Sequence, residues 1–196
     1  ICRVLRDKEP KAFFLENVQH IKNHDGGRTF KIIKENIRNL GYSFYYKKIR
    51  ACDYGLPQLR PRIFMVGFKD EDTKTEYFKF PDPIKLKKTM SDIFEGDCSR
   101  EIGFTLRLGG MGSKIDDRRN WDSYLVDGKV IKLQSDHAKQ MQGFPKSFKL
   151  PESRTKSLKL LGNSVAVDAV YAVAKQMLKY MENKESFKKN VQAKLV

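Results

Sequence analysis

The sequence is poor in cysteine, in histidine and in long apolar runs. Its three cysteines, Cys2, Cys52 and Cys98, are scattered and have no metal-ligand spacing, so they support neither a disulfide framework nor a zinc site. His20 and His24 lack the further ligands that a metal site requires, and we expect no bound metal. No apolar run approaches the roughly 18 residues of a membrane-spanning helix and no signal peptide is recognisable. We therefore expect no membrane insertion and a reducing, cytoplasmic location.

Acidic residues are scarce relative to basic ones. The 196 residues include 39 Lys and Arg but 24 Asp and Glu, which leaves a formal net charge of +15. This surplus is typical of a protein that binds a polyanion, and nucleic acid is the predicted partner, although a basic surface that serves only solubility is the alternative. Hydrophobic residues still make up 40% of the chain, which is enough for a core and excludes disorder throughout.

The first 68 residues alternate between helical and strand patterns. A helical opening precedes the strand AFFLEN, the helical stretch RTFKIIKENIRNLGY and the two strands SFYYKKIRA and RIFMVGF. This order predicts one half of an open α/β sheet, with an edge that another chain or a missing segment must cover. Because the chain opens at Ile1 inside a helical pattern, we expect that it has lost its beginning.

The remainder is mostly irregular and ends in helices. From Lys69 to Leu133 periodicity is weak, with short strand-like runs such as KFPDPI and YLVDGKVIKL, which predicts a small loop-rich domain. SDHAKQMQGFP predicts a short helix with Ser135 as N-cap. GNSVAVDAVYAVAKQMLKYM predicts one longer helix capped by Asn163 or Ser164, followed by a basic, solvated tail.

The stretch FFLENV, Phe13 to Val18, ends an apolar strand in an acid and an amide. Glu16 and Asn17 then stand at the carboxyl end of the strand, the edge at which open α/β sheets bind their ligands. The alternative is that Asn17 caps a turn and that Glu16 is solvated.

A second polar pattern occupies every second position of QLRPR. If the backbone there is extended, Gln58, Arg60 and Arg62 share one face. Otherwise the segment is a basic loop that precedes a strand. GNSV at Gly162–Val165 is either a simple helix cap or a set of backbone N–H groups offered to a ligand.

In this order and at these intervals, four motifs resemble those of the DNA (cytosine-5)-methyltransferase family. They are ENV at Glu16–Val18, QLRPR at Gln58–Arg62, QGFP at Gln142–Pro145 and GNSV at Gly162–Val165. The resemblance covers nearly the whole chain apart from the tail. It implies an α/β fold: the second half of a Rossmann-like S-adenosylmethionine-dependent methyltransferase sheet, plus a small loop-rich target-recognition domain.

The resemblance also implies a division of the chain. Residues 1–69 would be the carboxyl-terminal half of the catalytic domain and residues 70–160 the target-recognition domain. Residues 161–184 would be a helix that returns to the catalytic domain, and residues 185–196 a basic tail.

By similarity to the family, the first motifs hold a cytosine that has been flipped out of duplex DNA. Glu16, with Asn17 beside it, would bond N3 and the exocyclic amine, Arg62 would bond O2, and Arg60 would orient Glu16 or bind a phosphate. A second set, Asn163, Ser164 and Val165, would border the S-adenosylmethionine pocket. The segment Phe104 to Tyr124 lies where the family keeps its target-recognition domain. The DNA contacts that we predict are Gln58, Arg107, Lys114, Arg118 and Arg119.

The chain departs from the family in lacking a Gly-rich donor loop and a Pro-Cys nucleophile. Cys52 is a poor substitute because the family has no nucleophile at that place. We therefore expect a missing amino-terminal half or a partner subunit that carries the cysteine, in a bacterial restriction–modification methyltransferase. The alternatives are a non-catalytic DNA-binding subunit and an RNA cytosine methyltransferase.

Overall fold

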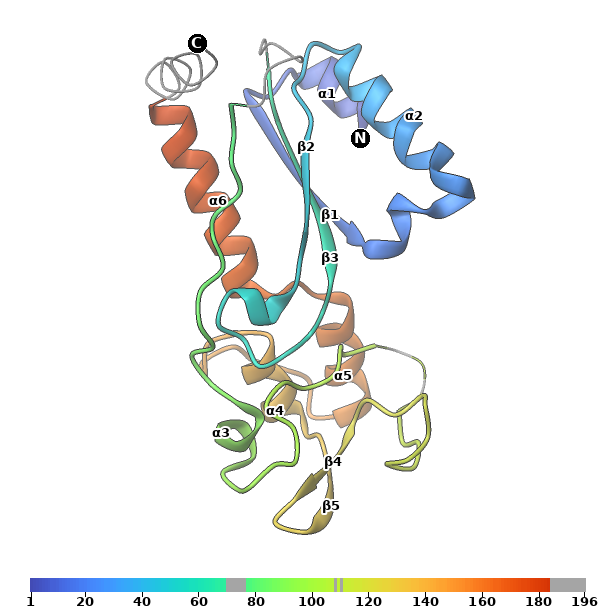
Figure 1. Cartoon of the computed structure of the whole chain (residues 1–196), viewed down its shortest axis with the longest axis vertical. Coiled ribbons are helices and arrows are strands. Elements are labelled where there is room, and N and C mark those ends of the chain that lie inside the picture. Colours follow the sequence, from blue (N-terminus) through green and yellow to red (C-terminus); the bar gives the residue numbers. More distant parts are fainter. Residues whose placement is uncertain (70–76, 108, 110, 184–196) are drawn as a thin grey trace. The chain divides into compact units, whose positions relative to one another are not determined.

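The computed structural model describes residues 1–69, 77–107, 109 and 111–183 (Figure 1). The tail predicted at residues 185–196 lies outside the described residues. The chain divides into two compact units. Unit 1 comprises Ile1–Ile49, Pro61–Pro81 and the chain from Val173 onward, and unit 2 comprises Arg50–Arg60 and Asp82–Ala172. The segment that carries Gln58 and Arg60 thus belongs to unit 2, whereas the domain boundaries predicted from sequence assign it to the catalytic half.

Unit 1 contains the predicted alternation of helices and strands. Its elements are α1 (Cys2–Lys8), β1 (Ala12–Val18), the 3-10 helices Gln19–Lys22 and His24–Gly27, α2 (Arg28–Arg38), β2 (Tyr45–Ile49) and β3 (Arg62–Phe68). The sheet order is β1-β3-β2, and β3 is antiparallel to both neighbours, so β1 and β2 run in the same direction. The α/β prediction is therefore confirmed.

Helices cover both faces of this sheet (Figure 1). On one face, Leu5 of α1 and Phe30 and Ile37 of α2 form a buried cluster with Ile63 and Met65 of β3. The helical spacing of Phe30 and Ile37 explains why α2 forms here, since it gives the helix one apolar stripe that the sheet can bury.

The opposite face of the sheet packs against α6 (Val167–Glu182), the last helix among the described residues. The rings of Phe68 and Tyr180 lie 4.6 Å apart, and the ring of Phe78 lies 5.5 Å from Phe68 and 5.6 Å from Tyr180. Because β3 is covered on both faces, it is nearly continuous in apolar residues, which is typical of a central strand.

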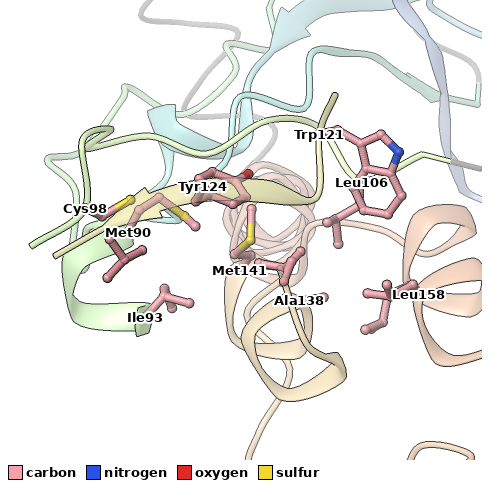
Figure 2. Packing of buried hydrophobic residues seen from close by; sticks show 12 residues of the cluster. Met90, Ile93, Cys98, Leu106, Trp121, Tyr124, Ala138, Met141 and Leu158 are labelled. Carbon is pink, nitrogen blue, oxygen red and sulfur yellow. The ribbon is translucent and has the colours of Figure 1, made fainter. Parts of the chain in front are cut away.

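Unit 2 is built from short elements around one core (Figure 2). They are α3 (Met90–Phe94), the hairpin β4 (Ser123–Val126) and β5 (Lys129–Lys132), α4 (Ser135–Met141), α5 (Arg154–Asn163) and the first part of α6. The hairpin turn is Asp127-Gly128 with φ of 49° and 73°, the combination that a type I′ turn requires. YLVDGKVIKL is thus a hairpin, whereas KFPDPI forms no regular strand.

The core of unit 2 is fully buried. Figure 2 shows Tyr124 of β4, Met141 of α4 and Leu158 of α5 pointing into the space between these elements. Each of these residues is at most 1% exposed. Trp121, the single tryptophan of the chain, is 1% exposed in the same cluster. A loop-rich unit of this size therefore holds its shape through one apolar cluster.

The helix ends differ from the prediction in two places. Helix α4 begins at Ser135 and its N-cap is Gln134, whose backbone N–H donates to Nδ1 of His137. The longer helix predicted with Asn163 or Ser164 as its cap is α6, which begins only at Val167, and a separate helix that was not predicted, α5, ends at Asn163. The extended backbone of Ser164 separates α5 from α6, and its N–H and hydroxyl both donate to the carbonyl of Leu161.

In the described part of the chain, no helix is both long and apolar enough to cross a membrane.

Gly67 in β3 is a position where the sheet leaves no room for a side chain. A Cβ there would overlap the backbone oxygen of Ser43 and the ring of Phe13. We expect Gly67→Ala to lower the free energy of unfolding by about 3 kcal/mol, because a backbone atom cannot move aside cheaply. Gly109→Ala is the control: a Cβ there has open space, and we expect a loss below about 1 kcal/mol. Chemical denaturation measures both, and equal losses would contradict the argument.

Candidate active site and nucleic-acid interface

The ladder between β1 and β3 brings Glu16 and Arg62 together. Glu16 lies opposite Phe64, and Arg62 lies opposite Val18, so the two charged side chains are diagonal neighbours on one face of the sheet. Nε of Arg62 lies 2.7 Å from Oε1 of Glu16. The Glu16 side chain is 26% exposed and that of Arg62 is 14% exposed. The pair is therefore a short, charge-assisted contact that solvent can still reach.

The guanidinium of Arg62 has two partners. Its Nη1 also donates to the carbonyl of Pro61 at 3.0 Å, which limits the rotation of the guanidinium. Asn17, the next residue after Glu16, is exposed and its Oδ1 accepts a hydrogen bond from the N–H of Val18 at 2.8 Å. The end of β1 thus places a carboxylate acceptor beside guanidinium donors. The Asn17 side chain bonds the backbone of the next residue.

Gln58 and Arg60 both form hydrogen bonds with backbone groups of unit 2. Gln58 is fully buried: Nε2 donates to the carbonyl of Met141 at 3.3 Å, and Oε1 accepts from the N–H of Leu106 at 3.2 Å. The backbone of Arg60 has a φ of 26°, so the segment is not regularly extended and the expected alternation on one face breaks there. A contact between Gln58 and DNA stays a prediction, and it would require this packing to open.

The Arg60 guanidinium joins two distant segments of unit 2. It is 3% exposed, and it donates to the carbonyl of Leu106 at 3.4 Å, to that of Gly162 at 3.1 Å and to that of Ser164. Three carbonyl acceptors on a buried arginine indicate a structural role, since each would otherwise be left without its donor. The predicted role in orienting Glu16 stays a prediction.

The predicted donor-site residues lie at the break between α5 and α6. Asn163 is the exposed last residue of α5, Ser164 is the break itself, and Val165 is 38% exposed. The N–H of Val167 donates to the carbonyl of Gln142 at 2.9 Å, which ties the start of α6 to the QGFP segment. A polar, accessible turn at this place fits the expectation that it borders a small ligand.

A buried ion pair organises the predicted recognition segment. Asp122 is fully buried, and its carboxylate accepts hydrogen bonds from Nη2 of Arg154 at 2.8 Å and from the N–H of Gly112 at 3.0 Å. The indole N–H of Trp121 donates to the carbonyl of Gly109 at 2.9 Å. The glycine-rich stretch is therefore fastened at two points. Sequence reasoning missed Asp122, for which the only signal was an acid inside the apolar run WDSYLV.

The predicted DNA-binding cations of this segment fall into two groups. Nη2 of Arg119 lies 2.8 Å from Oδ2 of Asp117, and Arg107 donates to the carbonyl of Arg119 at 2.6 Å. The hydrogen bonds from Arg119 lower the pKa of Asp117 to about 2. Lys114 and Arg118 are exposed, and neither forms an ion pair with a described residue. The second group is thus the more available for phosphate.

Cys52 does not have the environment of a nucleophile. Cys52 and Cys98 are buried, and burial raises the pKa of the Cys52 thiol, with Asp53 adding to the effect. A reactive cysteine needs its thiolate form, which both causes disfavour. Among the described residues, no group of three or more histidine, cysteine or acidic side chains could hold a metal ion.

Comparison with known proteins points to one family. The model of the C-5 cytosine-specific DNA methylase family matches residues 1–107 and 110–179. The type II methyltransferase M.SsoII of Shigella sonnei is 34% identical, with 93% of this chain and 57% of that protein covered. M.HhaI of Haemophilus parahaemolyticus is 31% identical, with 89% of this chain and 65% of that protein covered. The chain therefore spans less than two thirds of the length of these relatives.

Solved structures give the same fold. The DNMT2 of Spodoptera frugiperda, as an E260A/E261A/K263A mutant, matches with a TM-score of 0.65 and 14% identity over 90% of this chain and 70% of that chain. A putative DNA modification methyltransferase encoded within an E. coli prophage matches with a TM-score of 0.62 and 18% identity over 92% of this chain and 72% of that chain. The fold is that of an α/β methyltransferase.

The structural role of Arg60 can be separated from that of Arg62. We expect Arg60→Met to lower the free energy of unfolding by about 3 kcal/mol, because one buried and two partly buried carbonyls lose their donor. Arg62→Met leaves the Glu16 carboxylate, whose side chain is 26% exposed, in contact with water, and we expect a smaller loss of about 1.5 kcal/mol. Denaturant titration of each variant checks the difference, and a larger loss for Arg62→Met would refute it.

His137 at the start of α4 should make stability depend on pH. Burial lowers the pKa of His137, with Asp136 and Glu95 acting in the opposite direction, and its Nδ1 accepts the N–H of Gln134 at 3.2 Å. Because the unfolded chain then takes up the proton more readily, the free energy of unfolding falls as pH drops below about 6.5.

The matched variant is His137→Gln, which keeps an acceptor at the third helical position but does not titrate. We expect a smaller loss of stability between about pH 7.5 and about pH 5.5 in the variant than in the parent chain. Since His20 and His24 are present in both proteins, the difference reports His137 alone. Identical losses would show that His137 is not responsible.

Proposed function

Because the chain belongs to the C-5 cytosine-specific DNA methylase family, we propose that it forms the carboxyl-terminal part of a DNA cytosine-5 methyltransferase. The enzyme would flip a cytosine out of duplex DNA and transfer a methyl group to C5, in a restriction–modification system. The observation that carries the proposal is the 2.7 Å contact between Glu16 and Arg62 at the ligand-binding end of the sheet.

The Glu16–Arg62 pair has the chemistry that an extruded cytosine requires. The base must leave the stack, at a cost of roughly a few kcal/mol, and its Watson–Crick edge must then be held. The Glu16 carboxyl would hydrogen-bond N3 and the exocyclic amine. Arg62 would donate to O2. A guanidinium suits this place better than an ammonium because its planar fork keeps the direction of each donor fixed.

The same contacts would favour the reaction as well as binding. Attack of a thiolate on C6 leaves negative charge on the ring, and donors that already point at N3 and O2 stabilise that charge. Arg62 beside Glu16 would keep the carboxyl in place. Asn17 would support the end of β1 through its bond to the N–H of Val18.

The methyl donor would be S-adenosylmethionine, which supplies the methyl group that C5 accepts. Asn163, Ser164 and Val165 would border its pocket. Arg60 supports this assignment, because its bonds to the carbonyls of Gly162 and Ser164 hold the turn in one conformation. We infer that most of the pocket and the nucleophilic cysteine come from an amino-terminal segment or from a partner chain.

Duplex DNA is the proposed substrate, and the recognition segment of unit 2 would contact it. Lys114 and Arg118 are exposed and suited to phosphates. Arg107 and Arg119 are tied to the segment's own backbone and to Asp117, so they would shape the segment as well as contact DNA.

We expect Glu16→Gln, made in the complete enzyme, to reduce methyl transfer at least about a hundredfold while duplex binding persists, because the amide cannot share a proton with N3. Glu35→Gln on α2, which removes an exposed carboxylate of the same unit, is the control and should leave turnover unchanged. Transfer of labelled methyl groups to duplex DNA measures both. Unchanged turnover in Glu16→Gln would remove Glu16 from the mechanism.

The same assay separates the rival functions. Methyl transfer that appears only when a cysteine-bearing chain is added indicates a split enzyme. Tight duplex binding without transfer under any combination indicates a non-catalytic subunit. A parallel reaction with transfer RNA tests the RNA methyltransferase alternative.

A further inference from the structure

A polar pocket of about 400 Å³ opens in unit 1 beside the proposed active site. Gln19, His20, Lys22, Asn23, Tyr46 and Lys48 line it, together with Ile63. Two lysines and a histidine contribute to this pocket, and none of its lining residues is acidic. Such a lining favours an anionic ligand.

The pocket and the Glu16–Arg62 pair flank the same end of the sheet. The lining residues Gln19 to Asn23 follow β1 directly, and Lys48 lies opposite Ile63 in the ladder between β2 and β3. Because side chains alternate along a strand, Ile63 points to the opposite face from Arg62, its neighbour in sequence. The pocket and the pair therefore lie on opposite faces of the same sheet end, and a strand that meets both must pass across that end.

The pocket wall is fixed by the core of unit 1. The ring of Tyr46 packs edge-to-face on Phe30 at 4.9 Å, and Phe30 is 7% exposed. Nζ of Lys22 lies 5.3 Å from the centre of the Tyr46 ring, within the range of a cation–π contact. The ammonium of Lys22 is thus held over a ring that is itself anchored.

Neither pocket lysine is neutralised by an acid. Elsewhere in unit 1, Lys69 pairs with Glu9 at 2.7 Å and Lys31 with Glu35 at 3.9 Å. In the ranges that the structure describes, Lys22 and Lys48 form no ion pair with a carboxylate. Two ammonium groups without a carboxylate partner in one polar pocket can both donate hydrogen bonds to the anionic oxygens of a phosphodiester.

We propose that this pocket binds a backbone phosphate of the DNA whose flipped base is held by Glu16 and Arg62. The assignment rests on the proposed function, because it takes the ligand of the sheet end to be DNA. Lys22 and Lys48 supply the charge, His20, Gln19 and Asn23 supply further hydrogen-bond donors, and no base-specific contact is involved. The pocket would position the strand and carry no sequence information.

The test uses Lys22→Met together with Lys48→Met in the complete enzyme. Lys8→Met with Lys31→Met is the matched control, since it removes the same charge from exposed positions of α1 and α2. We expect the pocket variant to bind duplex DNA roughly tenfold more weakly, equally on target and unrelated sequences, and to lower the salt slope of log Kd by about 0.9 for the one phosphate lost. The control should change Kd less than about twofold. Equal effects in both variants would overturn the proposal.

A second measurement identifies the phosphate. Duplexes with one neutral methylphosphonate linkage at a time should show one linkage whose replacement weakens the parent enzyme, and the pocket variant should be insensitive to that same replacement. Inorganic phosphate, monitored by NMR of the lysine ammonium groups, tests the other source of this chemistry. If free phosphate shifts the Lys22 and Lys48 signals and no linkage is sensitive, the pocket binds a small anion and the proposal fails.

Failure of the pocket and failure of the proposed function give different results. If the pocket variant binds DNA like the control while Glu16→Gln abolishes methyl transfer, the proposed function stands and the pocket assignment falls. If Glu16→Gln leaves methyl transfer unchanged while the linkage signature is present, the phosphate site stands and Glu16 leaves the mechanism.

Discussion

The register between β1 and β3 is the constraint on which the candidate active site depends. A slip of one residue would carry Glu16 to the opposite face of the sheet and separate it from Arg62. Gly67 holds the register, because Phe13 and the backbone of Ser43 occupy the space in which any side chain at that position would lie. A packing constraint at one end of β3 therefore determines the charge pairing at its other end.

The residues of the QLRPR motif bond two different units of the fold. Gln58 and Arg60 bond backbone groups of unit 2, while Arg62 begins β3 and bonds Glu16 of unit 1. The positive φ of Arg60 is where the chain changes from one role to the other. One arginine thus fastens a turn and the next faces the proposed substrate, although the sequence presents them as equivalent.

The sequence patterns predicted those elements whose conformation depends on residues close together in the chain. The strands of unit 1 and helix α2 were predictable because alternation and helical spacing decide which face is buried. Helix α5 was missed because its few apolar residues, Leu158, Leu160 and Leu161, do not form a sustained helical period. The bonds from Arg60 to Gly162 and from Arg154 to Asp122 join residues far apart in the chain, and nothing in the spacing of either residue marks its partner.

The net charge of +15 indicates a polyanion but does not say where it binds. Part of that charge is committed within the fold: Arg60 is buried among carbonyls, Arg154 neutralises a buried carboxylate, and Arg119 is bonded to Asp117. An arginine that already donates to the protein must break those bonds before it can bind phosphate, whereas an exposed lysine without an acid gives up only water. The cations best suited to the proposed binding are therefore those without an acidic partner among the described residues, and Lys22 and Lys48 satisfy that condition inside a formed pocket.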